Sequence, residues 1–171
     1  MQILVSNIGS TSFKFRLFEA DGDDVRERAA GGADRIGGSG GVLRWAPAGD
    51  GDAGREQTRD FADHGAAIRC VLAELTAAGV LPAPDALDAV AFKTVMGGPG
   101  PAVAHVDEAV LARLQRYAAV APAHNPPYLA AMRLFAEALP DVPLVACFET
   151  GFHETMPPRR RHYAVPPEWA R

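Results

Sequence analysis

Residues 2–18, which read QILVSNIGSTSFKFRLF, predict a β-hairpin at the start of the chain. Residues 2–6 are a short apolar run, and residues 13–18 alternate large apolar side chains with Lys14 and Arg16. Between them, residues 7–12 supply the Asn, Gly and Ser that favour tight turns. The sequence therefore begins with two antiparallel strands joined by a polar tip.

The rest of the pattern predicts alternating helices and strands. Apolar residues at helical spacing predict helices from about Thr58 to Val80, around residues 110–117 with Asp107 as the N-cap, and over residues 128–139. Buried strands are predicted at residues 87–95 and 143–148. We expect an α/β fold in which the hairpin and these two strands share one sheet.

Residues 21–54 are rich in glycine and charge and show no helical period. A strand is predicted at residues 42–45 between glycine-rich turns. We expect the whole segment to be edge structure or a mobile insertion.

Length and composition favour one globular domain outside the nucleic-acid-binding and membrane classes. The 171 residues are 48% hydrophobic and 22% charged, and the net charge of −4 attracts neither phosphate backbones nor anionic lipids. No signal peptide or membrane-length apolar run is visible, so a cytoplasmic protein is expected. Cys70 and Cys147 form no Cys-x-x-Cys pattern, and both are expected to be buried thiols.

Two segments have the composition of anion-binding sites. Asn7, Ser10, Ser12 and Lys14 gather an amide, two hydroxyls and a cation at the hairpin tip, where free backbone N–H groups can surround a phosphate. An ordinary turn is the alternative. Lys93 ends a predicted buried strand before a Gly-Pro-rich loop, so a carboxylate or phosphate could be its partner, or its chain could extend to water.

Two further segments offer groups for phosphoryl chemistry. His124 and Asn125 lie in a proline-rich connection and could donate hydrogen bonds to a developing phosphoryl charge, or could close helix ends. Glu149 follows the strand at residues 143–148, where α/β phosphotransferases often carry an acidic residue linked to magnesium. Capping the next helix is the alternative for Glu149, and His64, His105 and His162 are given no role.

Taken in order and spacing, these four segments resemble the acetate and propionate kinase family, whose motifs are close to Asn-x-Gly-Ser-Ser-Ser and Ala-Pro-Leu-His-Asn-Pro. Residues 33–37 (ADRIG), 148–157 (FETGFHETMP) and 163–166 (YAVP) are also similar to family signatures. The resemblance implies an acetate-and-sugar-kinase/actin-type, ribonuclease H-like fold with a mixed sheet and flanking helices. Residues 1–150 would be its N-terminal domain and residues 151–171 the start of a truncated second domain.

The resemblance also implies an activity: phosphoryl transfer between ATP and a short-chain carboxylate such as acetate, with Mg²⁺ accompanying ATP. Lys93, His124 and Glu149 would be the catalytic residues, and Asn7 and Glu149 would be linked to the metal. The implied substrate and phosphate contacts are Asn7, Ser10, Ser12, Lys14, Lys93, Val95 at the acyl pocket, and Asn125.

The chain also departs from the family pattern. Residues 92–98 read FKTVMGG where the family has His-Arg-Val-Val-His-Gly-Gly, so Lys93 replaces an arginine that could hold a carboxylate at two points. Glu149 replaces an aspartate, and Ala123 replaces a leucine beside the acyl pocket.

The family's adenosine-binding glycine loops have no counterpart before Arg171. A noncatalytic remnant or split-enzyme subunit that binds a small anion or a partner chain is therefore the alternative interpretation. The expected partners are a small carboxylate and ATP, with a homodimer or a separate C-terminal-half chain also possible.

Overall fold

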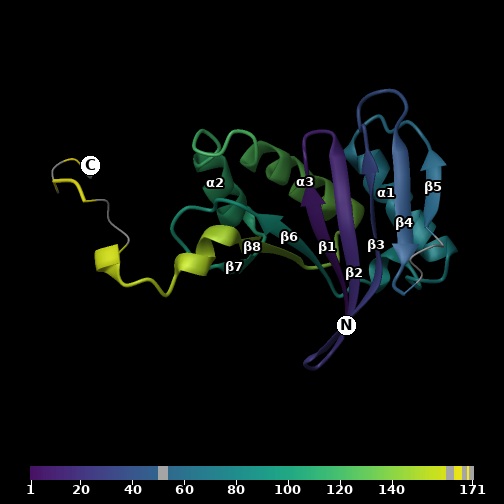
Figure 1. Ribbon diagram of the computed structural model, residues 1–171, viewed down its shortest axis with the longest axis horizontal. Helices are drawn as coiled ribbons and strands as arrows, with labels where there is room; N and C mark the ends of the chain where they lie inside the picture. The colour runs from purple at the N-terminus through teal and green to yellow at the C-terminus, as the bar shows by residue number, and fades with distance from the viewer. Residues whose placement is uncertain (50–53, 161–163, 167–168, 170–171) are drawn as a thin grey trace.

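The computed structural model describes residues 1–49, 54–160, 164–166 and 169 of the chain (Figure 1). Eight strands form one sheet in the order β5-β4-β3-β2-β1-β6-β8-β7. The strands are β1 (Gln2–Ile8), β2 (Ser12–Asp21), β3 (Asp24–Asp34), β4 (Val42–Pro47), β5 (Arg55–Thr58), β6 (Ala89–Thr94), β7 (Val103–His105) and β8 (Leu144–Phe148). The helices are α1 (His64–Ala77), α2 (Glu108–Arg116) and α3 (Asn125–Ala138), with short 3-10 turns η1 (Pro84–Ala86), η2 (Glu149–His153) and η3 (Pro158–Arg160).

The hairpin and the two later strands share one sheet, as predicted. β1 pairs antiparallel with β2, and Asn7 lies opposite Lys14. β6 pairs parallel with both β1 and β8, while the other neighbouring strands are antiparallel. The sheet is therefore mixed, with three parallel strands near one end.

The prediction for residues 21–54 was wrong over most of its length. β3 and β4 extend the hairpin into a meander, and the predicted strand at residues 42–45 lies within β4. β3 was not predicted because its glycines and alanines do not favour strands. Glycine is nevertheless required at two positions, since a Cβ on Gly31 would collide with Trp45, and one on Gly32 with the carbonyl of Phe13. Residues 50–53 lie outside the described residues.

The helices begin where capping chemistry allows. Asp107 accepts a hydrogen bond from the Val110 N–H at 2.8 Å, which confirms it as the N-cap of α2. α1 begins at His64, later than the periodicity predicted, because Asp63 caps it with a 2.7 Å bond from Ala66. α3 begins at Asn125, earlier than predicted, since prolines are tolerated in a first helical turn.

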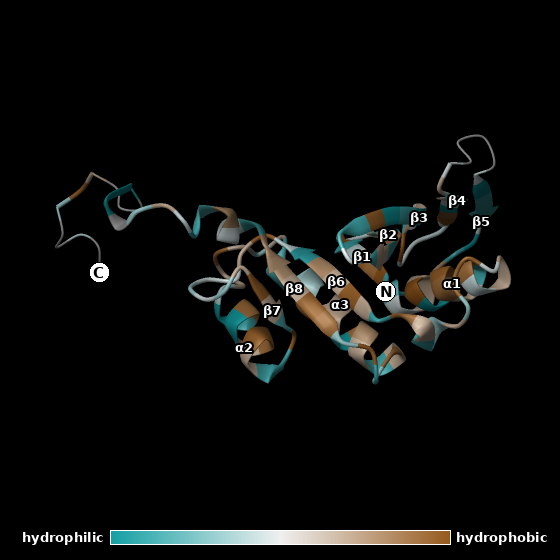
Figure 2. Cartoon of the chain, turned by 90° about the horizontal axis from the view of Figure 1, so that it is seen from below, coloured by the Kyte–Doolittle hydropathy of each residue, from teal (hydrophilic) through white to brown (hydrophobic). Residues whose placement is uncertain are grey.

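All three helices lie on one side of the sheet (Figure 2). α1 contacts β2 and β3, whereas α3 contacts β1, β6 and β8. Phe135 of α3 joins the two halves of the core, because its ring lies 6.0 Å from the ring of Phe13 and 5.3 Å from that of Phe92. Along each strand, alternate side chains point toward the helices, and the side chains between them point away from the helices.

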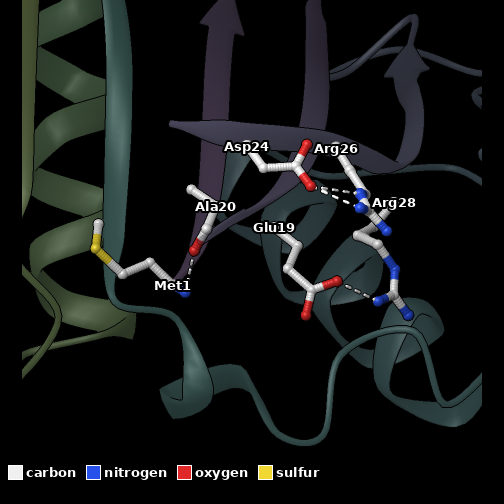
Figure 3. A network of polar contacts seen from close by, with 6 residues as sticks. All are labelled: Met1, Glu19, Ala20, Asp24, Arg26 and Arg28. Carbon is white, nitrogen blue, oxygen red and sulfur yellow. Dashed lines mark hydrogen bonds and ion pairs between the residues drawn. The ribbon is translucent and has the colours of Figure 1, made fainter. Parts of the chain in front are cut away.

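Exposed charges mark the far end of the β2–β3 hairpin (Figure 3). Arg26 pairs with Asp24 at 2.6 Å and Arg28 with Glu19 at 2.6 Å, while the Met1 ammonium donates to the Ala20 carbonyl at 2.7 Å. Because both ion pairs are solvated, each contributes only about 0–1 kcal/mol. They keep this projecting hairpin polar and do not hold the fold together.

The two cysteines differ in environment. Cys70 is buried as predicted, but the prediction for Cys147 was wrong, because its side chain is exposed on the sheet face away from the helices. Within the part of the chain that the structure describes, no helix has the length and apolar character needed to cross a membrane.

Replacing Phe135 by alanine tests the helix-to-sheet core. Phe135→Ala should lower the free energy of unfolding by about 3–5 kcal/mol, since it removes a fully buried ring from two aromatic contacts. Urea denaturation followed by circular dichroism measures the change. The matched control is Phe152→Ala, which removes a ring that is 86% exposed and should change stability by less than about 0.5 kcal/mol. Equal effects of the two substitutions would contradict this description of the core.

Candidate active site at the carboxyl ends of β6 and β8

Lys93 and Glu149 form an ion pair at the carboxyl ends of two adjacent parallel strands. Lys93 lies near the end of β6 and Glu149 directly follows β8, and Lys93 Nζ is 3.0 Å from Glu149 Oε1. The hydrogen bond to Glu149 raises the pKa of the Lys93 ammonium, and its charge adds to the effect while desolvation opposes it. Each side chain remains about half exposed, so the pair is accessible to solvent and to ligands.

Tyr128, in the first turn of α3, lies within electrostatic range of this pair, which the sequence analysis missed. Burial raises the pKa of the Tyr128 hydroxyl, the nearby Lys93 charge acts in the opposite direction, and Glu149 raises the pKa further. His124 stacks on Tyr128 with ring centroids 6.3 Å apart and an interplanar angle of 22°. The spacing i, i+4 from His124 was the available signal, because it places both rings on one side of the helix start.

His124 and Asn125 are adjacent in sequence but have different environments. The His124 side chain is exposed and makes no capping hydrogen bond to α3. Asn125 is fully buried, and its Nδ2 donates to the Leu114 carbonyl at 3.1 Å, which ties the start of α3 to α2. His124 is thus available to a ligand, whereas Asn125 as positioned here holds two helices together.

The hairpin tip is open to solvent. Asn7, Ser10 and Lys14 are exposed, and within the described residues their side chains make no hydrogen bond or ion pair. Ser12 is partly buried at the start of β2, and its carbonyl accepts from the Gly9 N–H at 2.9 Å. His64, which was given no role, has its Nε2 3.0 Å from the Gly9 carbonyl and so supports the tip from α1.

The loop after β6 packs tightly against its neighbours and borders a cleft. A Cβ on Gly97 would collide with Phe148, and one on Gly98, whose φ is +68°, with Tyr117. Val95 is partly buried and packs against the core. A cleft of about 920 Å³ lies between this loop and the segment after β8. Its lining residues are Met96, Gly98–Ala102, Phe148, Thr150, Gly151, His153, Glu154, Met156 and Arg160.

The predicted site residues lie near the cleft but do not line it. Phe148 and Thr150 flank Glu149 and line the cleft, but Asn7, Lys93, His124 and Glu149 do not. Lys93 pairs with Glu149, and His124 stacks on Tyr128. The hairpin tip lies at the end of the adjacent strand β1. The described residues alone therefore form no single cleft that Asn7, Lys93, His124 and Glu149 all line.

The donor set suits magnesium that is carried by a nucleotide better than a metal held by protein alone. Among the described residues, no three His, Cys, Asp or Glu side chains are grouped so that they could hold a metal ion. Mg²⁺ commonly binds through one or two carboxylates together with substrate phosphates and water. Glu149 can supply one such carboxylate, and the exposed Asn7 an amide oxygen.

Comparison with known proteins defines the class to which this fold and site belong. Residues 2–171 match the Acetokinase family. An acetate kinase of Streptomyces coelicolor is 40% identical over 173 residues, and one of Oceanobacillus iheyensis is 34% identical over 169 residues. These alignments cover 99% and 98% of this chain, and 41% of each relative. The chain belongs to the acetokinase family and spans about two fifths of the length of these curated relatives.

Solved structures confirm the predicted fold. The crystal structure of Porphyromonas gingivalis acetate kinase superposes with a TM-score of 0.86 at 29% identity, covering 99% of this chain and 42% of that one. A propionate kinase from Francisella tularensis gives a TM-score of 0.84 at 25% identity, with the same coverage. The eight-stranded domain is therefore the N-terminal, acetate-and-sugar-kinase/actin-type part of an acetate kinase fold. In the family segment at residues 163–166, Tyr163 lies outside the described residues.

Asn125→Ala tests whether this amide holds α2 and α3 together. The substitution should lower the free energy of unfolding by about 1–3 kcal/mol, because it leaves the buried Leu114 carbonyl without its donor. The control is His124→Ala, which removes an exposed ring at the neighbouring position and should cost less than about 1 kcal/mol. Chemical denaturation of both variants gives the comparison, and an unchanged stability for Asn125→Ala would contradict the structural role.

Glu149→Gln tests the ion pair through the pKa of Lys93. Loss of the carboxylate should lower that pKa toward the ordinary lysine value and reduce stability by less than about 1 kcal/mol, because the pair is half exposed. A raised pKa in the folded state stabilises the protein while Lys93 is protonated. The difference between the two proteins should therefore be present at neutral pH and disappear as pH rises through the raised pKa.

Lysine side-chain NMR provides the measurement. The chain contains only two lysines, Lys14 and Lys93, so the two titration curves are readily assigned. The Lys14 curve is the internal control, because Lys14 lies on β2 and makes no ion pair among the described residues. A Lys93 pKa that does not fall in Glu149→Gln would show that the pair does not form in solution.

Proposed function

We propose that this chain is part of an acetate-kinase-type phosphotransferase, which moves phosphate between ATP and a short-chain carboxylate such as acetate. The observation that carries the proposal is the convergence of Lys93 and Glu149, 3.0 Å apart, at the carboxyl ends of two parallel strands. Ligands of open α/β sheets bind at such strand ends. Membership of the acetokinase family supports the same reaction class.

Lys93 is the proposed carboxylate contact. Its ammonium already pairs with one carboxylate, Glu149, so the chemistry required to hold a substrate carboxylate is present. Val95, two residues further on, is proposed to contact the acyl chain, and the neighbouring cleft has room for a small organic acid. Because lysine offers a point charge rather than a planar two-point contact, we expect weaker substrate orientation than an arginine would give.

The phosphate side is proposed to involve His124 and the hairpin tip. His124 can donate to a developing phosphoryl charge, and stacking on Tyr128 restricts its ring. Asn7, Ser10, Ser12 and Lys14 are proposed to contact phosphate oxygens. Mg²⁺ bound with ATP would neutralise phosphate charge near Glu149 and Asn7. Asn125 is proposed to act by fixing the start of α3, and hence the position of His124.

A second candidate function follows from the altered motif at residues 92–98, where Lys93 stands in place of the arginine of the family pattern. A subunit that binds a small anion and joins a separate chain to complete the enzyme is the alternative, as is a noncatalytic remnant. We propose that residues 1–150 form one domain, that residues 151–171 begin a second, and that the protein acts in the cytoplasm.

Acetate binding to Lys93 variants tests the proposal. Lys93→Arg should tighten acetate binding by up to about 1–2 kcal/mol, since a second charge-assisted hydrogen bond becomes possible, and Lys93→Gln should abolish it. Isothermal titration calorimetry with sodium acetate, against sodium chloride at equal ionic strength, provides the measurement. Arg26→Lys, at the remote exposed pair with Asp24, is the matched control and should leave binding unchanged.

A separate assay, the formation of acetyl phosphate, tests phosphoryl transfer. The isolated chain with acetate, ATP and Mg²⁺ should form no acetyl phosphate, because catalytic groups of such enzymes are divided between two domains. Turnover by the isolated chain that His124→Ala abolishes would contradict the need for a second domain. Acetate binding that is unaffected in Lys93→Gln would remove Lys93 from the site.

A further inference from the structure

The hairpin tip is tied to the rest of the protein through two of its backbone carbonyl groups. His64, the first residue of α1, has its Nε2 3.0 Å from the Gly9 carbonyl. The Ile36 N–H donates to the Thr11 carbonyl at 2.9 Å. Both contacts come from outside the hairpin, so they fix the tip relative to α1 and to the segment that follows β3.

The contact between His64 and Gly9 has a defined direction. Asp63 caps α1 by accepting from the Ala66 N–H at 2.7 Å, which fixes where the helix begins and where the partly buried His64 lies. A carbonyl oxygen only accepts hydrogen bonds, so Nε2 of His64 must carry a hydrogen and donate it to Gly9. The imidazole therefore holds the Gly9 carbonyl toward α1.

This contact sets the direction of the next backbone N–H group. The Gly9–Ser10 peptide bond is planar and trans, so its C=O and N–H point in opposite directions. With the Gly9 carbonyl directed at α1, the Ser10 N–H points away from α1. The N–H groups of Ser10 and Thr11 donate to no acceptor among the residues that the structure describes, and both residues are exposed. These backbone donors are therefore available to a ligand.

We propose that His64 is a positioning residue for anion binding at the hairpin tip: its Nε2–H holds the Gly9 carbonyl and so directs the Ser10 N–H at a phosphate oxygen. Successive backbone N–H groups in turns form concave sites for such anions. This role rests on the phosphate contact proposed for the hairpin tip, and it adds a residue from a separate element. Without the His64 bond, the Gly9–Ser10 peptide can rotate, and phosphate binding must then offset the entropy lost on ordering it.

Titrations with sodium phosphate, followed by NMR at the Ser10 amide and compared with sodium chloride at equal ionic strength, test this role. His64→Ala should weaken phosphate binding about three- to tenfold, the worth of one hydrogen bond. His64→Gln should restore it, because the Gln amide nitrogen is as many bonds from Cβ as histidine Nε2. His64→Asn should not, because its amide is one bond shorter.

His105→Ala is the matched control. It removes an exposed imidazole from β7, which β6 and β8 separate from β1, and it should leave phosphate binding unchanged. The contact also has a readout that needs no ligand. The carbonyl-carbon resonance of Gly9 should move upfield in His64→Ala and His64→Asn and return in His64→Gln. An unchanged Gly9 resonance in all three variants would show that the contact is absent in solution and overturn the proposal.

Failure of this role and failure of the proposed function give different results. Equal phosphate affinity at Ser10 in the unmodified chain and in His64→Ala would overturn the positioning role and leave the phosphate contact standing. A loss of stability in His64→Ala without a loss of affinity would make His64 a structural brace only, and would also overturn it. No response of Ser10 to phosphate in the unmodified chain would remove the tip from the proposed function, and the positioning role with it. Acetate binding at Lys93 is measured separately.

Discussion

The parallel pairing of β6 with β1 on one side and β8 on the other is the constraint on which the rest of the structure depends. Parallel strands align their carboxyl ends, so segments distant in sequence finish at one edge of the sheet. Lys93 and Glu149 are 56 positions apart and meet for this reason alone. The crossover connections that parallel strands require also place α1 and α3 on one face, where Phe135 packs against both halves of the sheet.

The elements that the sequence predicted well are those whose local chemistry and tertiary environment agree. The alternation of Phe13, Phe15 and Leu17 is both a strand signal and the inner face of β2. Asp107 is a good N-cap by composition and caps α2 in the structure. β3 escaped prediction because close approach to Phe13 and Trp45 requires glycine, which has no strand preference of its own. Tertiary contact, rather than local propensity, decides that strand.

The candidate site also combines features that the local sequence predicts with features that only tertiary packing decides. Residue types identified Lys93, His124 and Glu149 as candidate groups for phosphoryl chemistry. In the structure Lys93 pairs with Glu149, and His124 stacks on Tyr128. The direct Lys93–Glu149 pair depends on strand register, which a single sequence does not specify. The burial of Asn125 depends on the packing of α2 against α3, so its side chain could not be distinguished from that of His124 by position in the motif.

The Lys93–Glu149 pair also determines how this site can respond to ligands. Each charge already has a partner, so a substrate carboxylate must displace Glu149 from Lys93, and a cation must displace Lys93 from Glu149. An exposed pair contributes only about 0–1 kcal/mol, so the cost of either displacement is small compared with a charge-assisted bond to the incoming ligand. A cation at Glu149 frees Lys93 for an anion, and an anion at Lys93 frees Glu149 for a cation. Because binding free energies are reciprocal, the two ligands would favour each other's binding through this single contact. An exposed, weakly held ion pair thus suits the proposed binding of a carboxylate together with magnesium, since it keeps both charges in place without a large penalty for separating them.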